Sequence, residues 1–175
     1  MDSSRLSARL KQPGHDRTFL TSETNFIAHA QTALDSSRYE VVANPPDLRA
    51  IFDRVGGGRA LGVNPEAAII SRETGRRFFV EVKKQGPAGN AEERACKHHT
   101  VQFYKTLAAI YPDYGYHPYV TVMCESLATD VRYTSKFVYL YEPGQYFLWA
   151  DYDHDLIAEY LRGRCAAWLD QKSAT

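Results

Sequence analysis

The chain has 175 residues, of which 44% are hydrophobic and 24% charged, and its formal net charge is zero. This composition predicts one globular domain over residues 1–175, with residues 1–20 as a flexible arm. No apolar run approaches the ~20 residues of a membrane span, and the polar N-terminus lacks the apolar centre of a signal peptide. Three cysteines without a Cys-x-x-Cys spacing argue against disulfides or zinc, so we expect a cytoplasmic protein without membrane contact.

The first third of the chain alternates helix and strand signals. Ser22 is placed to cap a helix over residues 23–34, and residues 39–42 form a short β-type run. Residues 47–54 are expected to form a helical turn. The three glycines at 56–58 then predict a flexible loop, since no Gly-Lys-Ser/Thr follows them as it would in a phosphate loop.

Two apolar runs, Ala67–Ser71 and Arg77–Val82, are rich in Ile, Phe and Val and predict neighbouring strands. Thr74 and Gly75 are expected to be the loop residues of the hairpin between them, since glycine tolerates a positive φ. The side chains of alternate residues in a strand share a face. One face of this hairpin would then be buried and apolar, formed by Ile69, Phe78, Val80 and Val82.

The other face of this hairpin gathers polar groups. With the two-residue loop, Glu66 lies opposite Lys83, and Glu81 lies diagonal to Glu66, opposite Ala68. A register shifted by one residue would separate the three groups. Two carboxylates and a lysine at one place can bind a divalent metal ion and activate water against a phosphodiester. The alternative is a solvated cross-strand pair of Glu and Lys with no chemical role.

A set of motifs surrounds these residues. Pro65-Glu66 and Glu81-Val82-Lys83 are followed by Gln85-Gly86 and then by Gly-Asn-Ala-Glu-Glu-Arg at residues 89–94. In this order the motifs resemble those of the EcoRI/MunI group of type II restriction endonucleases, within the PD-(D/E)xK nuclease superfamily. The resemblance covers residues 64–125. It implies an α/β fold, a restriction-endonuclease-like mixed central β-sheet flanked by α-helices.

The resemblance also implies a function. It predicts Mg²⁺-dependent hydrolysis of phosphodiester bonds in double-stranded DNA, at a short palindrome with an AATT core, by a homodimer. Glu66 and Glu81 would bind Mg²⁺ with the backbone carbonyl of Val82, and Lys83 would orient or activate the attacking water. The residues expected to contact DNA are Asn90, Glu93 and Arg94, which would read base edges, together with Gly89, Ala91 and Lys97.

Two departures from the family pattern keep alternatives open. Glu66 stands where the family has Asp, and only residues 87–88 separate the Gln-Gly from the Gly-Asn-Ala motif. One alternative is therefore a structure-selective nuclease of DNA repair or phage defence, and another is a catalytically weak DNA-binding module. If Glu66 is not a metal ligand, Glu23 and Glu40 are the next candidates.

The Gly-Asn-Ala motif has a structural alternative as well. Asn90 could cap a helix, with Glu93 completing a pair that resembles a capping box. The two interpretations are compatible, because proteins commonly present a helix N-terminus to DNA. His98 and His99, a few residues further on, are expected at the surface or beside DNA phosphates.

The second half of the chain continues the α/β pattern. A helix over residues 91–111 is predicted, followed by a strand over 119–124 that runs parallel to residues 78–82, because a helix crosses between them. Residues 136–141 and 145–149 are expected to pair as a late hairpin, before a closing helix over 155–169. The buried stripe of the first helix would comprise Cys96, Thr100, Phe103, Leu107 and Ile110. The tyrosines at 111, 114, 116 and 119 are expected in a loop packed beside the sheet.

Overall fold

A mixed β-sheet forms the centre of the computed structural model, which describes residues 22–46, 48, 63–86, 89–110 and 118–172. Within these residues the sheet has five strands in the order β1-β2-β3-β4-β5. The first three strands pair antiparallel, and β3, β4 and β5 pair parallel. The strands are β1 (Tyr39–Ala43), β2 (Ala67–Ser71), β3 (Arg77–Gln85), β4 (Tyr119–Glu125) and β5 (Tyr146–Trp149).

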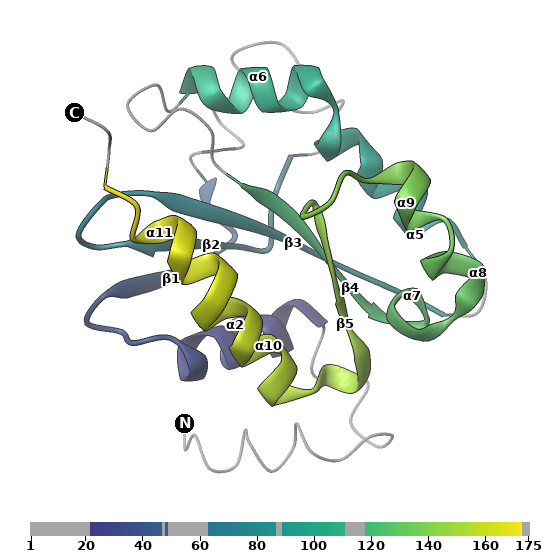
Figure 1. The fold of residues 1–175 in the computed structure, drawn as a ribbon, viewed down its shortest axis with the longest axis horizontal. Coiled ribbons are helices and arrows are strands. Elements are labelled where there is room, and N and C mark those ends of the chain that lie inside the picture. The colour runs from purple at the N-terminus through teal and green to yellow at the C-terminus, as the bar shows by residue number, and fades with distance from the viewer. Residues whose placement is uncertain (1–21, 47, 49–62, 87–88, 111–117, 173–175) are drawn as a thin grey trace.

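Helices flank this sheet (Figure 1), which confirms the predicted fold class. None of the helices in the described residues is long and apolar enough to span a membrane. The helices are α2 (Ser22–Ala33), α5 (Ala91–Ala95), α6 (Val101–Ile110), α7 (Ser126–Thr129), α8 (Val131–Thr134), α9 (Phe137–Leu140), α10 (His154–Tyr160) and α11 (Ala166–Leu169), and the shorter turns are η1 (Cys96–His99), η3 (Ala150–Tyr152) and the π-type η4 (Leu161–Cys165).

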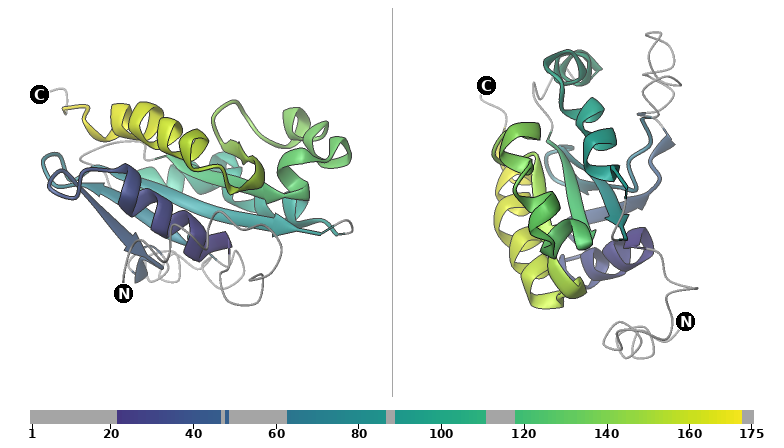
Figure 2. Two further views of the ribbon diagram at one scale, coloured as in Figure 1. Left: turned by 90° about the horizontal axis from the view of Figure 1, so that it is seen from below. Right: turned by 90° about the vertical axis from the view of Figure 1, so that its right-hand side faces the viewer.

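The two faces of the sheet bury different sets of side chains. Ile69, Phe78 and Val80 pack on one face with residues of α2, α10 and α11, as the alternating pattern predicts. The left view of Figure 2 shows the C-terminal helices running along the sheet. The opposite face carries Phe79 and Tyr119 against α6, and a further cluster joins the end of β4 to α5 and α7–α9.

The register of the β2–β3 hairpin differs from the prediction by two residues. Ala67 pairs with Val80, and the Ser71 N–H donates to the Arg76 carbonyl, so the loop comprises residues 72–75. A two-residue loop was therefore the wrong expectation. Because side chains alternate with a period of two, a shift of two residues leaves every side chain on its predicted face. One position beyond the Ala67–Val80 pair, Glu66 comes opposite Glu81 instead of Lys83.

The prediction of one continuous helix over residues 91–111 is wrong. The chain forms α5, then the 3-10 turn η1, and then the separate helix α6. Thr100 breaks it with an extended backbone, φ −78° and ψ 153°, and its hydroxyl accepts a hydrogen bond from the Phe103 N–H. Phe103 and Leu107 are buried as expected, whereas Thr100 is exposed and Cys96 only half-buried. The Ile110 side chain and residue 111 lie outside the described part.

The predicted late hairpin is also wrong. Residues 137–140 form α9, and β5 pairs parallel with β4. Phe137 and Tyr141 are one helical turn apart and pack together against the apolar side of α5, so tertiary contacts override the β-type composition of Phe-Val-Tyr-Leu. The parallel pairing of β3 with β4 is confirmed, and so is the closing helix, which runs from α10 through η4 to α11.

Several sequence predictions lie outside the described residues. These are the N-terminal arm, the glycine loop at 56–58 and nearly all of the helical turn over 47–54. The tyrosines at 111, 114 and 116 lie outside as well. The assignment of residues 1–175 to one domain stays a prediction.

Candidate active site

The three predicted catalytic side chains lie together on one face of the sheet. Glu66 directly precedes β2, and Glu81 and Lys83 alternate along β3, on the face opposite Phe78 and Val80. Their side chains are 14%, 4% and 27% exposed, respectively. A pair of carboxylates and an ammonium group, all largely buried, is unlike the solvated surface pair that was the structural alternative.

In each carboxylate of this cluster, one oxygen accepts a hydrogen bond and the other faces the ammonium group of Lys83. The Val82 N–H donates to Glu66 Oε2 at 2.6 Å, and Glu66 Oε1 lies 3.7 Å from Lys83 Nζ. The Tyr119 hydroxyl donates to Glu81 Oε2 at 3.0 Å, and Glu81 Oε1 forms an ion pair with Lys83 Nζ. One oxygen of each carboxylate is thereby held, and the other two converge on a single ammonium group.

The electrostatics of this cluster favour the binding of a cation. Burial, and next the negative charge of Glu81, raise the pKa of Glu66 from 4.5 to about 8, although Lys83 opposes the shift. In the absence of a further cation, Glu66 is therefore largely protonated near neutral pH. A divalent ion between them would favour the doubly ionised form.

The donor set fits a hard divalent cation. Among the described residues no group of three or more His, Cys, Asp or Glu side chains is arranged to hold a metal. The cluster would therefore supply two carboxylates, with the carbonyl of Val82 as the expected third oxygen. Mg²⁺ is commonly bound by one or two carboxylates and keeps several waters. Of the alternative ligands, Glu40 is exposed and faces Arg72 at 3.6 Å, and the Glu23 side chain lies outside the described part.

His98 is buried and His99 is half-buried, so the predicted surface position is wrong for His98 and only partly met by His99. His98 is 1% exposed, and its Nδ1 lies 4.0 Å from Glu81 Oε1. His99 Nε2 lies 2.7 Å from the Thr121 hydroxyl, in the middle of β4. The 3-10 turn η1 causes this inward orientation, because it places both rings against the strand beside β3. A continuous helix over residues 91–111 could not have predicted it.

Hydrogen bonding determines the protonation of His99. The Tyr104 hydroxyl donates to the Tyr119 carbonyl at 3.0 Å and contacts His99 Nδ1 at 2.9 Å. The hydroxyl has one proton, so Nδ1 must carry a hydrogen and donate, which leaves Nε2 to accept from Thr121. Burial, and next the charge of His98, lower the pKa of His99 to about 3, consistent with a neutral ring.

Tyr119 is the neighbour of the cluster that sequence reasoning missed. It was assigned both to a loop packed beside the sheet and to the start of a strand over residues 119–124. The strand is confirmed, because Tyr119 is the first residue of β4 and is fully buried. Its register partner is Phe79, two positions before Glu81, so the ring lies on the same face as the carboxylates. Polar side chains at alternate positions of an otherwise apolar strand, Tyr119 and Thr121, were the sequence signal.

The Gly-Asn-Ala segment is fastened to the end of β3 by Gln85. Its side-chain oxygen accepts from the Ala91 N–H at 2.6 Å, and its amide donates to the Tyr133 hydroxyl at 2.8 Å. Gly89 has φ +139°, and a Cβ there would come within 2.6 Å of the Gln85 side chain. Glycine is therefore required at 89 for both conformation and space.

The side chains predicted to read DNA differ in how they are held. Asn90 occupies the N-cap position of α5, but its side chain makes no capping hydrogen bond, which argues against the purely structural alternative. Glu93 is ion-paired at 3.1 Å with Lys136, which also contacts the fully buried Glu92. Arg94 is exposed, as is Lys97 on the next turn.

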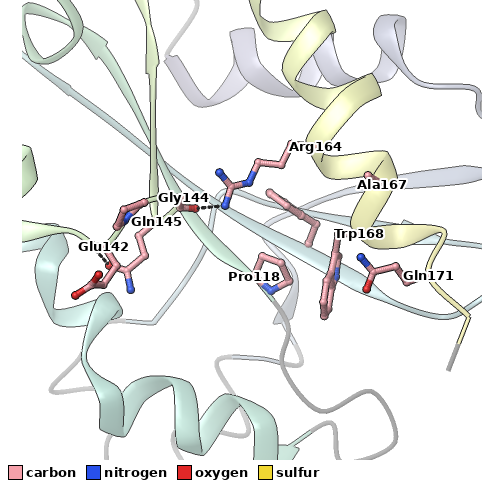
Figure 3. A pocket seen from close by; sticks show the side chains of 10 residues that line it. Pro118, Glu142, Gly144, Gln145, Arg164, Ala167, Trp168 and Gln171 are labelled. Atoms are coloured by element: carbon pink, nitrogen blue, oxygen red, sulfur yellow. Dashed lines mark hydrogen bonds between the residues drawn. The ribbon is translucent and has the colours of Figure 1, made fainter. Parts of the chain in front are cut away.

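A groove lies away from the carboxylates, on the other side of β3. It has a volume of about 410 Å³ and is lined by Phe78, Trp168 and Arg164, among others (Figure 3). Arg164 donates to the Gly144 carbonyl at 3.1 Å across it. Phe78 points to the opposite face of β3 from Glu81, so the groove is separate from the candidate active site.

Comparison with known proteins agrees with this geometry. A solved structure described as the MunI restriction endonuclease in complex with cognate DNA has the same fold, with a TM-score of 0.58 and 21% identity. The match covers 76% of this chain and 83% of that one. No curated protein matches significantly. The family model for the type II restriction enzyme MunI matches residues 1–170, well beyond the resemblance at 64–125. The chain therefore belongs to the MunI family of type II restriction enzymes, which are DNA-cleaving hydrolases.

Proposed function

We propose that this chain hydrolyses phosphodiester bonds of double-stranded DNA at a short palindrome with an AATT core, using Mg²⁺. Restriction endonucleases typically use divalent metal ions, and the observation that supports Mg²⁺ here is the convergence of two carboxylate oxygens on Lys83. The odd number of free cysteines fits a reducing cytoplasm, where we place the protein.

The candidate residues divide the chemistry among them. Glu66 and Glu81 would hold the metal ion, which would lower the pKa of a water molecule and stabilise the charge that develops on the phosphate. The Val82 N–H keeps Glu66 oriented through Oε2. Lys83 would leave its ion pairs when the metal neutralises the carboxylates. Its side chain is 27% exposed, and its ammonium group would then orient the attacking water toward the phosphorus.

DNA recognition is assigned to the segment from Gly89 to Lys97. Asn90 and Arg94 are exposed, and Asn and Arg can pair bidentately with adenine and guanine. Glu93 is held by Lys136, and Lys97 would contact phosphate. The related structure described as a complex with cognate DNA supports DNA as the partner. We propose a homodimer, since a two-fold site is best matched by a two-fold protein.

The weaker alternative, a DNA-binding module without catalysis, depended on Glu66 replacing Asp. Here Glu66 reaches both the Val82 N–H and the neighbourhood of Lys83, so the longer side chain is accommodated. The structure-selective alternative depended on the short link at residues 87–88, which lie outside the described part. Membership of the MunI family of type II restriction enzymes favours sequence-specific cleavage.

Cleavage of plasmid and phage DNA tests the proposal. The wild-type protein should give discrete fragments with Mg²⁺ and none with EDTA. Glu81→Gln and Lys83→Ala should lower the rate by at least about 10²–10³-fold, the loss seen when one preorganised electrostatic group is removed. Circular dichroism should show that both variants are folded. Random smears would favour the structure-selective nuclease, and near-normal cutting by either folded variant would refute the assigned site.

A further inference from the structure

Tyr119 occupies a rigid position directly behind the carboxylates. Its ring centroid lies 5.0 Å from that of Phe103 and 5.3 Å from that of His98. Its backbone carbonyl accepts the Tyr104 hydroxyl, and β4 pairs with β3 on one side. The ring therefore has little freedom to move, and its hydroxyl points at one atom, Glu81 Oε2.

The two carboxylates of the cluster are held by different kinds of donor. Glu66 Oε2 is held by the backbone N–H of Val82, which any residue at 82 except proline would supply. Glu81 Oε2 is held by a side chain from another strand, which only Tyr119 supplies. The position of Glu81 Oε2 therefore depends on the identity of the residue at 119, whereas that of Glu66 Oε2 depends on the backbone.

We propose that Tyr119 is a positioning residue, which occupies Glu81 Oε2 and thereby directs Oε1 toward the metal and Lys83. The inference rests on the proposed metal site and names a residue that acts on it through Glu81. A carboxylate held at one oxygen presents the other in a fixed direction, and it cannot rotate to bind a metal through both oxygens. Removal of a group that orients a metal ligand in this way typically lowers metal affinity by roughly 10–100-fold.

A phenol suits this role because it remains a donor. Burial, and next the negative charge of Glu81, raise the pKa of Tyr119 well above its ordinary value. The neutral hydroxyl keeps its hydrogen and donates it to Glu81 Oε2. It adds no charge to the cluster, unlike an arginine or lysine, and so would not compete with the cation.

The test compares Tyr119→Phe with the control Tyr104→Phe. The control removes a neighbouring hydroxyl that contacts His99 and the Tyr119 carbonyl but no carboxylate. Mn²⁺ binding is measured without DNA by electron paramagnetic resonance, and cleavage is measured across a Mg²⁺ titration. Tyr119→Phe should weaken Mn²⁺ binding and raise the Mg²⁺ requirement by roughly 10–100-fold. Excess Mg²⁺ should restore much of its maximal rate. Tyr104→Phe should bind Mn²⁺ like the wild type, whatever its thermal stability.

The outcomes separate this inference from the proposed function. If the wild-type protein binds no Mn²⁺ and cuts no DNA, both fall. If it binds and cuts, and folded Tyr119→Phe has the same metal dependence, only the positioning role is overturned. If Tyr119→Phe does not fold, the double variant Glu81→Gln/Tyr119→Phe decides. If the double variant folds, the hydroxyl is needed because of the Glu81 carboxylate, as the inference requires. If neither the single nor the double variant folds, the inference is overturned.

Discussion

The candidate cleavage centre and the recognition segment differ in where their polar side chains find partners. Glu66, Glu81 and Lys83 are largely buried and satisfy one another through donors from β3 and β4. Asn90 and Arg94 are exposed on a short helix, and the Asn90 side chain makes no capping bond. Under the proposed function, the catalytic groups would be preorganised before DNA binds, whereas the recognition groups would find their partners in the substrate.

The largest effect on the cleavage rate is expected for substitutions of Glu66, and it tests the assignment of the candidate cleavage centre. Glu66→Ala should abolish cleavage, because one of the two converging oxygens is lost. Glu66→Asp should keep measurable activity, since aspartate is the residue that the family pattern has at this position. Glu40→Ala is the matched control, because Glu40 is an exposed acid paired with Arg72.

Initial rates in saturating Mg²⁺ measure these differences. Normal cutting by Glu66→Ala would show that the second carboxylate of the metal lies elsewhere in the chain. Loss of activity in Glu40→Ala would direct the search to β1.

The recognition segment should respond through binding and not through stability. Arg94→Ala should weaken binding to cognate DNA by about 1–3 kcal/mol for a lost bidentate base contact. Binding to random DNA, which phosphate contacts dominate, should change much less. DNA-binding titrations are carried out with Ca²⁺ in place of Mg²⁺, so that cleavage does not interfere, and at one fixed salt concentration. Equal weakening on both DNAs would instead make Arg94 a phosphate contact, as we expect for the control Lys97→Ala.

The carboxylate pair predicts a dependence of stability on pH. The pKa of Glu66 is raised from 4.5 to about 8, so the protonated form is favoured by folding. Its stabilising contribution is present in full below about pH 4.5 and is lost as the pH rises through about 8. Without metal, the wild type should therefore lose stability across this window relative to Glu66→Gln.

Urea unfolding in EDTA at several pH values measures this effect. Parallel stability profiles of the two proteins would contradict it. Adding Mn²⁺ near pH 7 should release protons from the wild type, detectable as a buffer-dependent binding enthalpy, and should release fewer from Glu66→Gln.

The smallest effect is expected at Asn90. Loss of a true N-cap costs about 0.5–2 kcal/mol. Because the Asn90 side chain makes no capping hydrogen bond, Asn90→Ala should change the free energy of unfolding by less than about 0.5 kcal/mol. Its specific DNA binding should nevertheless fall. A larger loss of stability with unchanged binding would reinstate the capping role.

The sequence by itself determined those features of the site that follow from the order of neighbouring residues. The alternation of apolar residues assigned Glu66, Glu81 and Lys83 to one face of a hairpin, and the motifs around them indicated the family. This assignment survived a wrong loop length, because an error of two residues preserves the face of every side chain. The Gly89 requirement likewise follows from a property of the residue itself, its tolerance of positive φ.

Only the tertiary structure decided which distant side chains surround that face. Tyr119 reaches Glu81 because β4 pairs parallel with β3, and His98 turns inward because Thr100 interrupts the helix. Lys136 meets Glu93 because residues 137–140 fold as a helix against α5, despite their β-type composition. These contacts join residues 38 to 43 positions apart or depend on a local break that packing stabilises. Propensity and periodicity act over a few residues, and they carry no information about such pairs.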